Sequence, residues 1–429
     1  MVSVKGKQFI NQRYTEHYYN ELTELKNCSD KYKLQEERLY DFINYIKKNS
    51  EYYDDVLNDI NEPISFQNLK LLPLLEKSTI NKHLDAIITT NENLIKGQTG
   101  GSTGIGMVYY TSPYDMSRKF AFLDYFKESH GVFKGMKRVS IGGKTIIPNR
   151  QKKKNFWRYN KPLNQMLFSA YHADGENLKY YIRQLNKFRP ETIDGFTTVI
   201  HRMAKYINDR EIKLNFKPIA IFPTAEALTD EMKLDIEKAF NCPVRNQYAS
   251  SEGAPFITEN INGELEINPE TGVFELEHIQ DNIYELIVTG FYTTTTPLFR
   301  YKIGDSVELY EKLSTNYTQK DIKIKRIIGR NNDFLISNER GIVTNINLST
   351  VIRDAGSSIK NSQFIQNKLD EVEIYLVVEE GINKNKLEKL LISKLKIRFG
   401  ETTNFKFKYV DSISKTAGGK TRFTINNIG

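Results

Sequence analysis

Residues 218–248 read PIAIFPTAEALTDEMKLDIEKAFNCPVRNQY, and this stretch determines the fold class. The apolar run Pro218–Pro223 predicts a buried strand, and the spacing of apolar residues from about Thr229 to Phe240 predicts an amphipathic helix. Further short strands are predicted at Pro243–Tyr248 and, upstream, at Thr192–Gly195. Strands that alternate with helices are typical of an α/β sheet whose strand ends carry functional loops. The predicted fold class is therefore α/β.

The segments on either side of this region predict helices before it and strands after it. Apolar and aromatic residues recur at helical spacing between about Thr15 and Asn49, which predicts amphipathic helices. We expect them to form a helical lead-in over about residues 1–90. Strand-like runs at Val273–His278 and Tyr284–Thr289 predict a β-rich subdomain that follows the α/β sheets.

The end of the chain predicts a separate small domain. Glu371–Val378 and Asn404–Val410 alternate as strands, and residues 384–398 between them have helical spacing. This order predicts a compact α+β domain. The polar stretch Gly329–Asp333 is the expected hinge, because hinges favour short polar segments. We therefore expect a large domain over residues 1–330 and a small mobile lid domain over residues 331–429.

Composition indicates a globular protein with a large core. The chain has 429 residues, of which 39% are hydrophobic. No apolar run approaches the roughly 20 residues that cross a bilayer, and the first residues lack a hydrophobic signal core. Cys28 and Cys242 are too few for a disulfide framework or a cysteine zinc site, so we expect ordinary thiols. We expect a cytoplasmic protein that does not insert into a membrane.

The excess of positive charge has two open explanations. The formal net charge is +8, but the densest basic run, Gln151–Tyr159, is short. Elsewhere the lysines are interleaved with acidic residues, which argues against a nucleic-acid-binding protein. The excess suits either an anionic small substrate or simple solubility.

The glycine-rich stretch Gly97–Met107 reads GQTGGSTGIGM and matches neither of the two common phosphate motifs. A Walker A loop needs a lysine and then a hydroxyl where Met107 and Val108 stand, and the glycine spacing of a dinucleotide fold is absent. A loop of this composition is often an ordinary connection. It can also wrap a polyphosphate with backbone N–H groups and with the hydroxyls of Thr99, Ser102 and Thr103.

Further patches follow the glycine loop in a fixed order. They are Phe222–Glu226, Gln247–Glu252, Phe299–Asp305 and Gly329–Asp333, with Ser414–Lys420 at the far end. Together they resemble the adenylate-forming superfamily of acyl-CoA synthetases and related ligases. The phenylacetate-CoA ligase-like branch, which includes enzymes associated with capsular polysaccharide synthesis, is the most similar. The resemblance extends from about Leu69 to Arg422 and implies a large ATP- and acyl-binding domain followed by a small lid domain.

The resemblance implies an ATP-dependent, AMP-forming ligase. A carboxylate is activated to an acyl adenylate with release of pyrophosphate, and the acyl group then passes to coenzyme A or to an amine or hydroxyl of a polysaccharide precursor. The implied partners are ATP, Mg²⁺, a small carboxylate and the acyl acceptor, and the expected assembly is a monomer or homodimer. In the alternative, the chain is a catalytically weakened nucleotide-binding member with a scaffold or regulatory role, since Gly100 and Met107 stand where the family keeps serine and lysine.

The resemblance also implies which residues hold ATP. The glycine loop binds the β- and γ-phosphates, Thr224 to Glu226 lies against the adenine, and Asp305 and Arg330 contact the ribose or phosphate. Glu226 also suits a helix N-terminus, where a carboxylate is favoured by the dipole. The implied nucleotide-binding set is Thr99, Ser102, Thr103, Gly104, Thr224, Ala225, Glu226, Gln247, Tyr248, Ala249, Ser250, Ser251, Asp305 and Arg330.

The chemistry is assigned by resemblance to two residues and an acyl pocket. Lys420 is the catalytic lysine on the lid, and Glu252 is the catalytic carboxylate that holds magnesium together with Thr103. A carboxylate beside phosphate oxygens suits magnesium. The implied acyl pocket, whose members individually also suit a core, is Phe168, Tyr171, His172, Phe196 and Thr197.

Overall fold

The structure of the chain is a computed structural model. It describes residues 13–58, 64–99, 107–143, 146–148, 153–173, 175–330, 334–339, 341–356, 358–414 and 422–428; within them, the side chains of residues 330, 342, 344–346, 349, 350 and 353 are not described. The chain divides into two compact units. The first ends at Ile303 and also includes Leu309–Arg326, and the second contains Gly304–Glu308 and the chain from Ile327 on.

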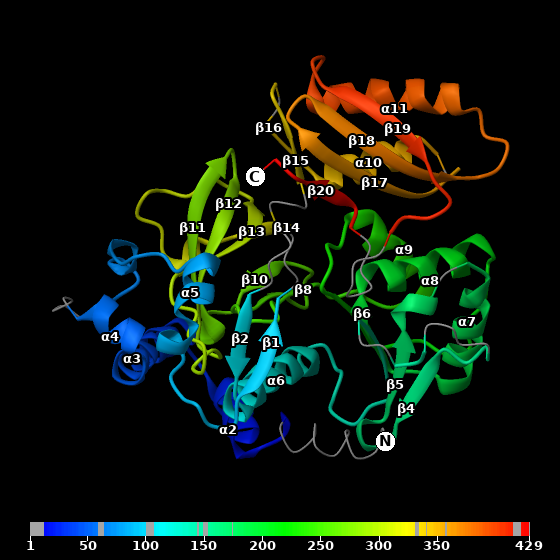
Figure 1. Cartoon of the computed structure of the whole chain (residues 1–429). Helices are drawn as coiled ribbons and strands as arrows, with labels where there is room; N and C mark the ends of the chain where they lie inside the picture. Colours follow the sequence, from blue (N-terminus) through cyan, green and yellow to red (C-terminus); the bar gives the residue numbers. More distant parts are fainter. Residues whose placement is uncertain are drawn as a thin grey trace. The chain divides into compact units, whose positions relative to one another are not determined.

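A five-stranded sheet in the first unit has the order β4-β5-β3-β6-β7; β4, β5 and β6 are labelled in Figure 1. Its strands are β3 (Arg138–Gly142), β4 (Trp157–Asn160), β5 (Gln165–Ser169), β6 (Thr192–Phe196) and β7 (Ala220–Thr224). Strands β5, β3, β6 and β7 are parallel, and β4 is an antiparallel edge strand. The carboxyl ends of the parallel strands therefore lie along one edge, where α/β folds place ligands.

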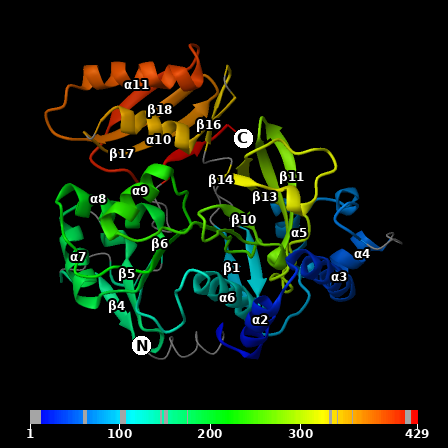
Figure 2. The same ribbon diagram turned by 180° about the vertical axis from the view of Figure 1, so that it is seen from behind.

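Helices cover both faces of this sheet, as Figures 1 and 2 show. Strand β7 explains the layering, because successive side chains of a strand point to opposite faces. Ile221 packs into the core shared with α7, α8 and α9, whereas Ala220 and Phe222 pack with Phe122 and Phe126 of α6. The bounds of these helices are Pro113–Glu128 (α6), Leu178–Phe188 (α7), Thr197–Asp209 (α8) and Asp230–Phe240 (α9). The α/β class and the helix predicted at 229–240 are confirmed.

The β-rich part predicted at 273–289 is also present. A seven-stranded sheet has the order β11-β12-β13-β14-β10-β9-β8, and β1 and β2 form a separate antiparallel hairpin. The strands are β1 (Ile95–Gln98), β2 (Val108–Thr111), β8 (Gln247–Tyr248), β9 (Ile257–Glu259), β10 (Leu265–Ile267), β11 (Gly272–Gln280), β12 (Ile283–Gly290), β13 (Tyr301–Leu309) and β14 (Ile324–Arg330).

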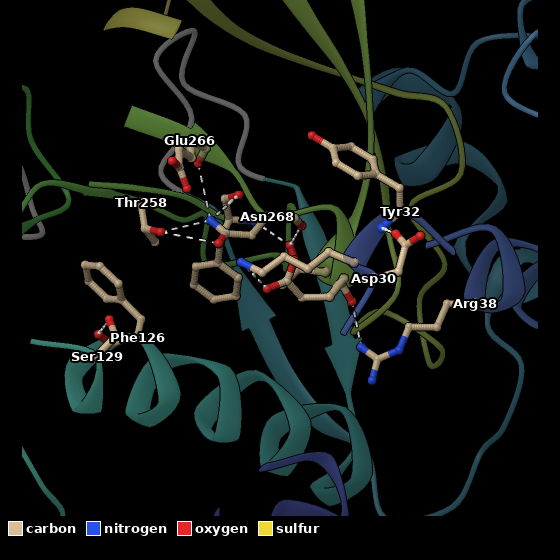
Figure 3. Close-up of polar contacts among 12 residues, drawn as sticks. Asp30, Tyr32, Arg38, Phe126, Ser129, Thr258, Glu266 and Asn268 are labelled. Carbon is tan, nitrogen blue, oxygen red and sulfur yellow. Dashed lines mark hydrogen bonds and ion pairs between the residues drawn. The ribbon is translucent and has the colours of Figure 1, made fainter. Parts of the chain in front are cut away.

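The predicted helical lead-in packs onto this sheet through polar contacts. The helices are α2 (Glu16–Asn27), α3 (Lys31–Asn49), α4 (Glu51–Leu57) and α5 (Lys77–Ile87). The N-cap residue of α3 is Asp30, whose carboxylate accepts from the N–H groups of Tyr32 and Lys33. Its Arg38 donates to the carbonyl of Glu270 at 2.6 Å (Figure 3). Glu270 lies in the short 3₁₀ turn η5 (Pro269–Thr271), and β11 begins directly after this turn, so the contact ties the lead-in to the sheet.

The second unit contains a four-stranded sheet with the order β19-β18-β17-β20 and the hairpin β15–β16. Its elements are β15 (Phe334–Ser337), β16 (Gly341–Thr344), α10 (Asn345–Asp354), β17 (Ile359–Lys368), β18 (Glu371–Val378), α11 (Lys384–Phe399), β19 (Asn404–Tyr409) and β20 (Thr424–Asn426). One core joins apolar side chains of α10, α11 and the sheet. The strand, helix and strand predicted between residues 371 and 410 are confirmed.

The two cysteines and the apolar character of the helices were also considered in the sequence. Cys28 is half-buried and Cys242 is buried, and both are free thiols, as predicted. Among the helices in the described ranges, none has the length and apolar character that a membrane span requires.

Gly195 in β6 allows the sheet to pack closely. Its φ is +142°, and a Cβ at this position would lie 2.0 Å from the carbonyl oxygen of Ile141 on β3. We expect Gly195→Ala to lower the free energy of unfolding by about 3 kcal/mol, because the neighbouring backbone cannot move aside. Chemical denaturation measures this. Gly142→Ala is the control, since a Cβ there meets no atom within 4 Å; equal losses in the two variants would contradict the prediction.

Candidate functional site

The carboxyl edge of the five-stranded sheet brings predicted site segments together. Thr224 ends β7, and Phe196 and Thr224 are paired in the register of β6 and β7. A parallel bridge between Ile221 and Val244 continues this edge beyond β7. Thr224 lies as far along the chain from Ile221 as Gln247 lies from Val244, so the two parallel segments reach the same edge together. The patches Phe222–Glu226 and Gln247–Glu252 therefore come together at this edge.

Glu226 caps the helix that follows β6. Its Oε2 accepts from the backbone N–H and the hydroxyl of Thr198, each at 2.8 Å. The hydroxyl of Thr197 donates to the Glu226 carbonyl at 3.1 Å. Helix α8 has no cap from its own N-cap residue, Phe196, so a carboxylate from the β7 end satisfies its N-terminus. This contact corresponds to the helix N-terminal interpretation of Glu226 and holds the Thr224–Glu226 turn against the start of α8.

The predicted acyl-pocket residues lie at the ends of β5 and β6. Phe168, Phe196 and Thr197 are buried, and Phe168 belongs to the core shared with α7 and α8. The half-buried His172 has its Nδ1 2.8 Å from the Ser169 hydroxyl, and its ring stacks on Phe156. The hydroxyl of Tyr171 donates to the carbonyl of Gly143, just after β3, at 3.1 Å. These contacts place the five residues at one sheet edge, and their role toward an acyl group stays a prediction.

The segment from Gln247 to Glu252 forms a strand and then a tight turn. Gln247 and Tyr248 pair with β9, and both side chains are buried. The Ser250 hydroxyl oxygen accepts from the backbone N–H groups of Gly253 and Ala254, which closes the turn. The exposed Ser251 donates to Oε2 of Glu252 at 3.1 Å, and Glu252 is only 6% exposed. Ala249 packs at the margin of the apolar cluster around Phe122 and Phe256.

Strand β9, which follows this turn, is held in place by residues that come after β10. Asn268 donates to the hydroxyl of Thr258 at 2.9 Å and to the carbonyl of Glu266 at 3.3 Å (Figure 3). The hydroxyl of Thr271 accepts from the N–H of Phe256 at 2.9 Å. Since all these contacts are buried or nearly so, the chain just after Glu252 has a fixed path.

The amide oxygen of Gln247 is an acceptor without a hydrogen-bond donor among the described residues. The side chain is buried, at 8% exposure, and its Oε1 has no partner in the part of the chain that the structure describes. A buried polar atom without a partner costs stability, so such atoms in folded proteins call for an explanation. A ligand donor at the carboxyl edge of the sheet would satisfy this oxygen.

The glycine loop is described only at its two ends. Thr99 donates its N–H to the Met107 carbonyl at 2.9 Å, and its hydroxyl accepts from the Met107 N–H at 3.0 Å, which closes the β1–β2 hairpin. Ser102, Thr103 and Gly104 lie outside the described residues. The Met107 side chain is fully buried, and its sulfur accepts from the Tyr301 hydroxyl. A core residue thus stands where the resemblance implies a lysine.

Three predicted residues belong to the second unit. Asp305 is buried on β13, directly after Gly304 with its φ of +78°. Arg330 ends β14, but its side chain is not described, and Lys420 lies outside the described residues. Their roles toward ATP stay predictions. Among the described residues, no three His, Cys, Asp or Glu side chains form a group that could hold a metal.

Sequence reasoning missed two residues that approach the Ser250–Glu252 turn. Tyr109 follows the glycine loop on β2; burial raises the pKa of its phenol, with Glu252 adding to the rise and a hydrogen bond to Ser251 opposing it. Lys119 on α6 donates to the Ser250 carbonyl at 2.6 Å. Burial lowers the pKa of Lys119 to about 8, although the carboxylates of Glu252 and Asp115 oppose that shift.

Sequence reasoning also missed Asp115, one helical turn before Lys119. Its Oδ1 accepts from the N–H and hydroxyl of Thr294, and its Oδ2 accepts from the same two groups of Thr295, all at 2.7–2.9 Å. Asp115 is only 1% exposed. Four donors on one buried carboxylate fix the start of α6 against the threonine-rich turn before β13.

Comparison with known proteins places these features in a family. The family model described as the CapK C-terminal domain matches residues 335–427. The whole chain is 64% identical to Protein CapK of Staphylococcus aureus, in a match that covers 100% of this chain and 96% of that protein.

Solved structures show the same fold at low sequence identity. A crystal structure of 2-hydroxyisobutyryl-CoA ligase in the postadenylation state, in complex with 2-HIB-AMP, is similar with a TM-score of 0.68 and 13% identity, over 92% of this chain and 89% of that one. The amide bond synthetase McbA from Marinactinospora thermotolerans is similar with a TM-score of 0.52 and 13% identity, over 77% and 68% of the two chains. The chain thus has the fold of adenylate-forming ligases, which confirms the resemblance seen in the sequence.

Glu226 has two predicted roles, capping of α8 and contact with the nucleotide, and a substitution distinguishes them. We expect Glu226→Ala to lower the free energy of unfolding by about 1 kcal/mol, the usual cost of a lost N-terminal cap. Thr198→Val removes one of the two groups that donate to this carboxylate and should cost less. Denaturation of both variants measures this, and an unchanged stability of Glu226→Ala would contradict the capping role. A rise in the KM for ATP in this variant would show an additional contact with the nucleotide.

The four bonds to Asp115 predict a large stability effect. We expect Asp115→Asn to lower the free energy of unfolding by about 3 kcal/mol, because the NH₂ group of the amide would face a buried backbone N–H and leave it without an acceptor. Asp85→Asn on α5 is the control, since Asp85 is exposed and should change stability by less than about 0.5 kcal/mol. Thermal and chemical denaturation measure both variants. A loss in Asp115→Asn no larger than in the control would show that these bonds contribute little.

Proposed function

Because the chain belongs to the CapK family, we propose that it is an AMP-forming ligase that activates a carboxylate with ATP and acts in capsular polysaccharide synthesis. Three things support the proposal: the fold of adenylate-forming ligases, the ordered sequence patches and the site at the carboxyl edge of the sheet. The observation that carries it is the buried Gln247 oxygen, an acceptor with no donor among the described residues, next to Tyr248 and close in sequence to Glu252. The exocyclic amine of adenine is a donor of the required kind.

The first step joins the carboxylate to the α-phosphate. A carboxylate oxygen attacks the α-phosphorus and forms a new O–P bond, the bond from that phosphorus to the bridging oxygen breaks, and pyrophosphate leaves. In this proposal Thr224, Ala225 and Tyr248 lie against the adenine, and Ser251 donates to the substrate carboxylate or the α-phosphate. Asp305 accepts from the ribose hydroxyls. Lys420 supplies a positive charge to the oxygens at which negative charge develops.

The donor set fits magnesium. Glu252 would hold the ion with one carboxylate, with Thr103 as the second predicted protein ligand, and phosphate oxygens and water would complete the shell. When bound, the ion would neutralise charge on the phosphates. The Ser251 hydroxyl donates its single proton to Glu252 in the structure and would turn to the substrate on binding, so burial is what limits the freedom of the Glu252 carboxylate in the complex.

The second step transfers the acyl group. A nucleophile attacks the carbonyl carbon of the acyl adenylate, and AMP leaves with the bridging oxygen. Similar solved structures include a CoA ligase and an amide bond synthetase, so their names point to a thiol in one and an amine in the other. We propose coenzyme A, or an amine or hydroxyl of a polysaccharide precursor, as the acceptor of this chain. Movement of the lid domain about residues 329–333 would switch the site from formation of the acyl adenylate to transfer of the acyl group.

Isotope exchange between ATP and pyrophosphate tests the first step. We expect the full chain to show exchange with at least one acid of a panel of aryl and small aliphatic carboxylates. Lys420→Ala should lower the rate at least about a hundredfold, because an electrostatic contact to the transition state is lost. Lys389→Ala, a change at an exposed lysine of α11, should leave the rate unchanged.

Two outcomes would contradict the proposed function. One is the absence of exchange with every acid, and the other is an equal rate in Lys420→Ala and in the unchanged chain. Retained binding of ATP without exchange would instead support a nucleotide-binding scaffold, the role that Gly100 and Met107 favour. Where exchange occurs, mixing the pre-formed adenylate with coenzyme A, amino sugars or amino acids identifies the acceptor.

A further inference from the structure

Helix α6 presents two charged side chains to the loops around the site. Asp115 accepts four hydrogen bonds from Thr294 and Thr295, and Lys119, one turn later, faces the Ser250–Glu252 turn. Residues four apart in a helix lie on the same face. Asp115 therefore fixes where the Lys119 amine is placed, independently of the turn itself.

The Lys119 amine contacts the turn through its backbone. It donates to the Ser250 carbonyl at 2.6 Å and lies 3.5 Å from the Ser251 carbonyl. Hydrogen bonds from an ammonium group are shorter and stronger than neutral ones. Because these carbonyls precede Glu252, they set the direction in which its carboxylate leaves the chain.

The opposite side of the turn is closed by packing. Gly253 has a φ of +108°, and a Cβ there would lie 2.5 Å from the methyl group of Thr293. A Cβ on Gly290 would lie 2.6 Å from the Gly253 carbonyl oxygen. The turn is therefore held between the Lys119 amine and the backbone around residues 290–293, and it cannot move away from Lys119 without loss of packing.

The Lys119 amine matters because the glycine loop has no basic residue of its own. The glycine loop Gly97–Met107 contains no lysine or arginine, and Met107 is buried. Lys119 contacts the carbonyls of Ser250 and Ser251, which directly precede Glu252. Its amine therefore brings a cation to the turn that the proposed site assigns to the phosphates of ATP.

We propose that Lys119 is a positioning residue for ATP, which fixes the Ser250–Glu252 turn and contributes the positive charge that the glycine loop does not contain. This inference rests on the proposed function, because it assigns the residue to the nucleotide of the same site. It adds to that function a residue outside the sequence patches. Lys119 acts through the turn, and no contact between it and the reacting atoms is part of the inference.

The test compares ATP affinity in matched variants of the full chain. We expect Lys119→Met to raise the KM for ATP in pyrophosphate exchange about tenfold or more, the effect of losing a hydrogen bond from a charged group. Lys119→Arg, which keeps the charge and the donors, should stay within about threefold of the unchanged chain. Lys127→Met is the control, because Lys127 lies on the same helix and is buried, but pairs with Asp194. This control should lose stability and keep its KM for ATP.

Two outcomes would overturn the inference: an unchanged KM for ATP in Lys119→Met, or an equal rise in Lys119→Arg. If Lys119→Met does not fold, Lys119→Gln replaces it; the amide can still donate to Ser250 but has no charge, and a smaller rise in KM is expected that still exceeds the rise in Lys119→Arg. Thermal melting of each variant shows whether it is folded.

Calorimetric titration with MgATP keeps the two proposals apart. If the unchanged chain binds ATP but shows no exchange with any acid, the proposed reaction fails, while a weaker affinity in Lys119→Met still supports the role of Lys119. If exchange is normal and Lys119→Met binds ATP as the unchanged chain does, the role of Lys119 fails and the reaction stands. If the unchanged chain does not bind ATP, both fail.

Discussion

The buried carboxylate of Asp115 is the interaction on which the organisation of the first unit depends. It joins the start of α6, which follows the glycine hairpin, to the threonine-rich turn before β13, across 179 and 180 residues of sequence. From this anchor α6 runs with Phe122 and Phe126 against Phe222 of β7 and with Lys119 against the Ser250–Glu252 turn. Helix α6 thus contacts strand β7 and the turn after β8, and it directly follows the hairpin that contains the glycine loop. A carboxylate with four donors can hold such a junction because burial is costly only for groups that lack partners.

The sequence predicted elements whose signal is local. The helix at 229–240 and the strand, helix and strand between residues 371 and 410 were predictable because apolar spacing over one element shows its period. The α/β class followed from the order of such elements around residues 218–248. The patches Phe222–Glu226 and Gln247–Glu252 were recognised as site segments because they occur in a fixed order with the other patches. The structure adds that these two patches come together at one edge of the sheet.

Contacts between distant segments could not be predicted in the same way. Lys119 and Ser250 are 131 residues apart, and nothing in the residues around Lys119 distinguishes it from Lys127, the other lysine of α6. The capping contact of Glu226 was predicted as a helix N-terminal interaction, but its partner, Thr198, belongs to the helix after β6 and not to the helix that follows Glu226 in sequence. The burial of Met107 was equally unpredictable, since the sequence resemblance implied only that a lysine is absent at this position. Long-range packing decides each of these cases.

Isotope labelling tests the formation of an acyl adenylate directly. If a carboxylate labelled with ¹⁸O is activated at the α-phosphorus, the bridging oxygen stays on that phosphorus when the acyl group is transferred. Mass spectrometry of the products should therefore find one labelled oxygen in AMP and none in pyrophosphate. Label in orthophosphate or pyrophosphate, or AMP without label after complete acyl transfer, would contradict the formation of an acyl adenylate by this chain.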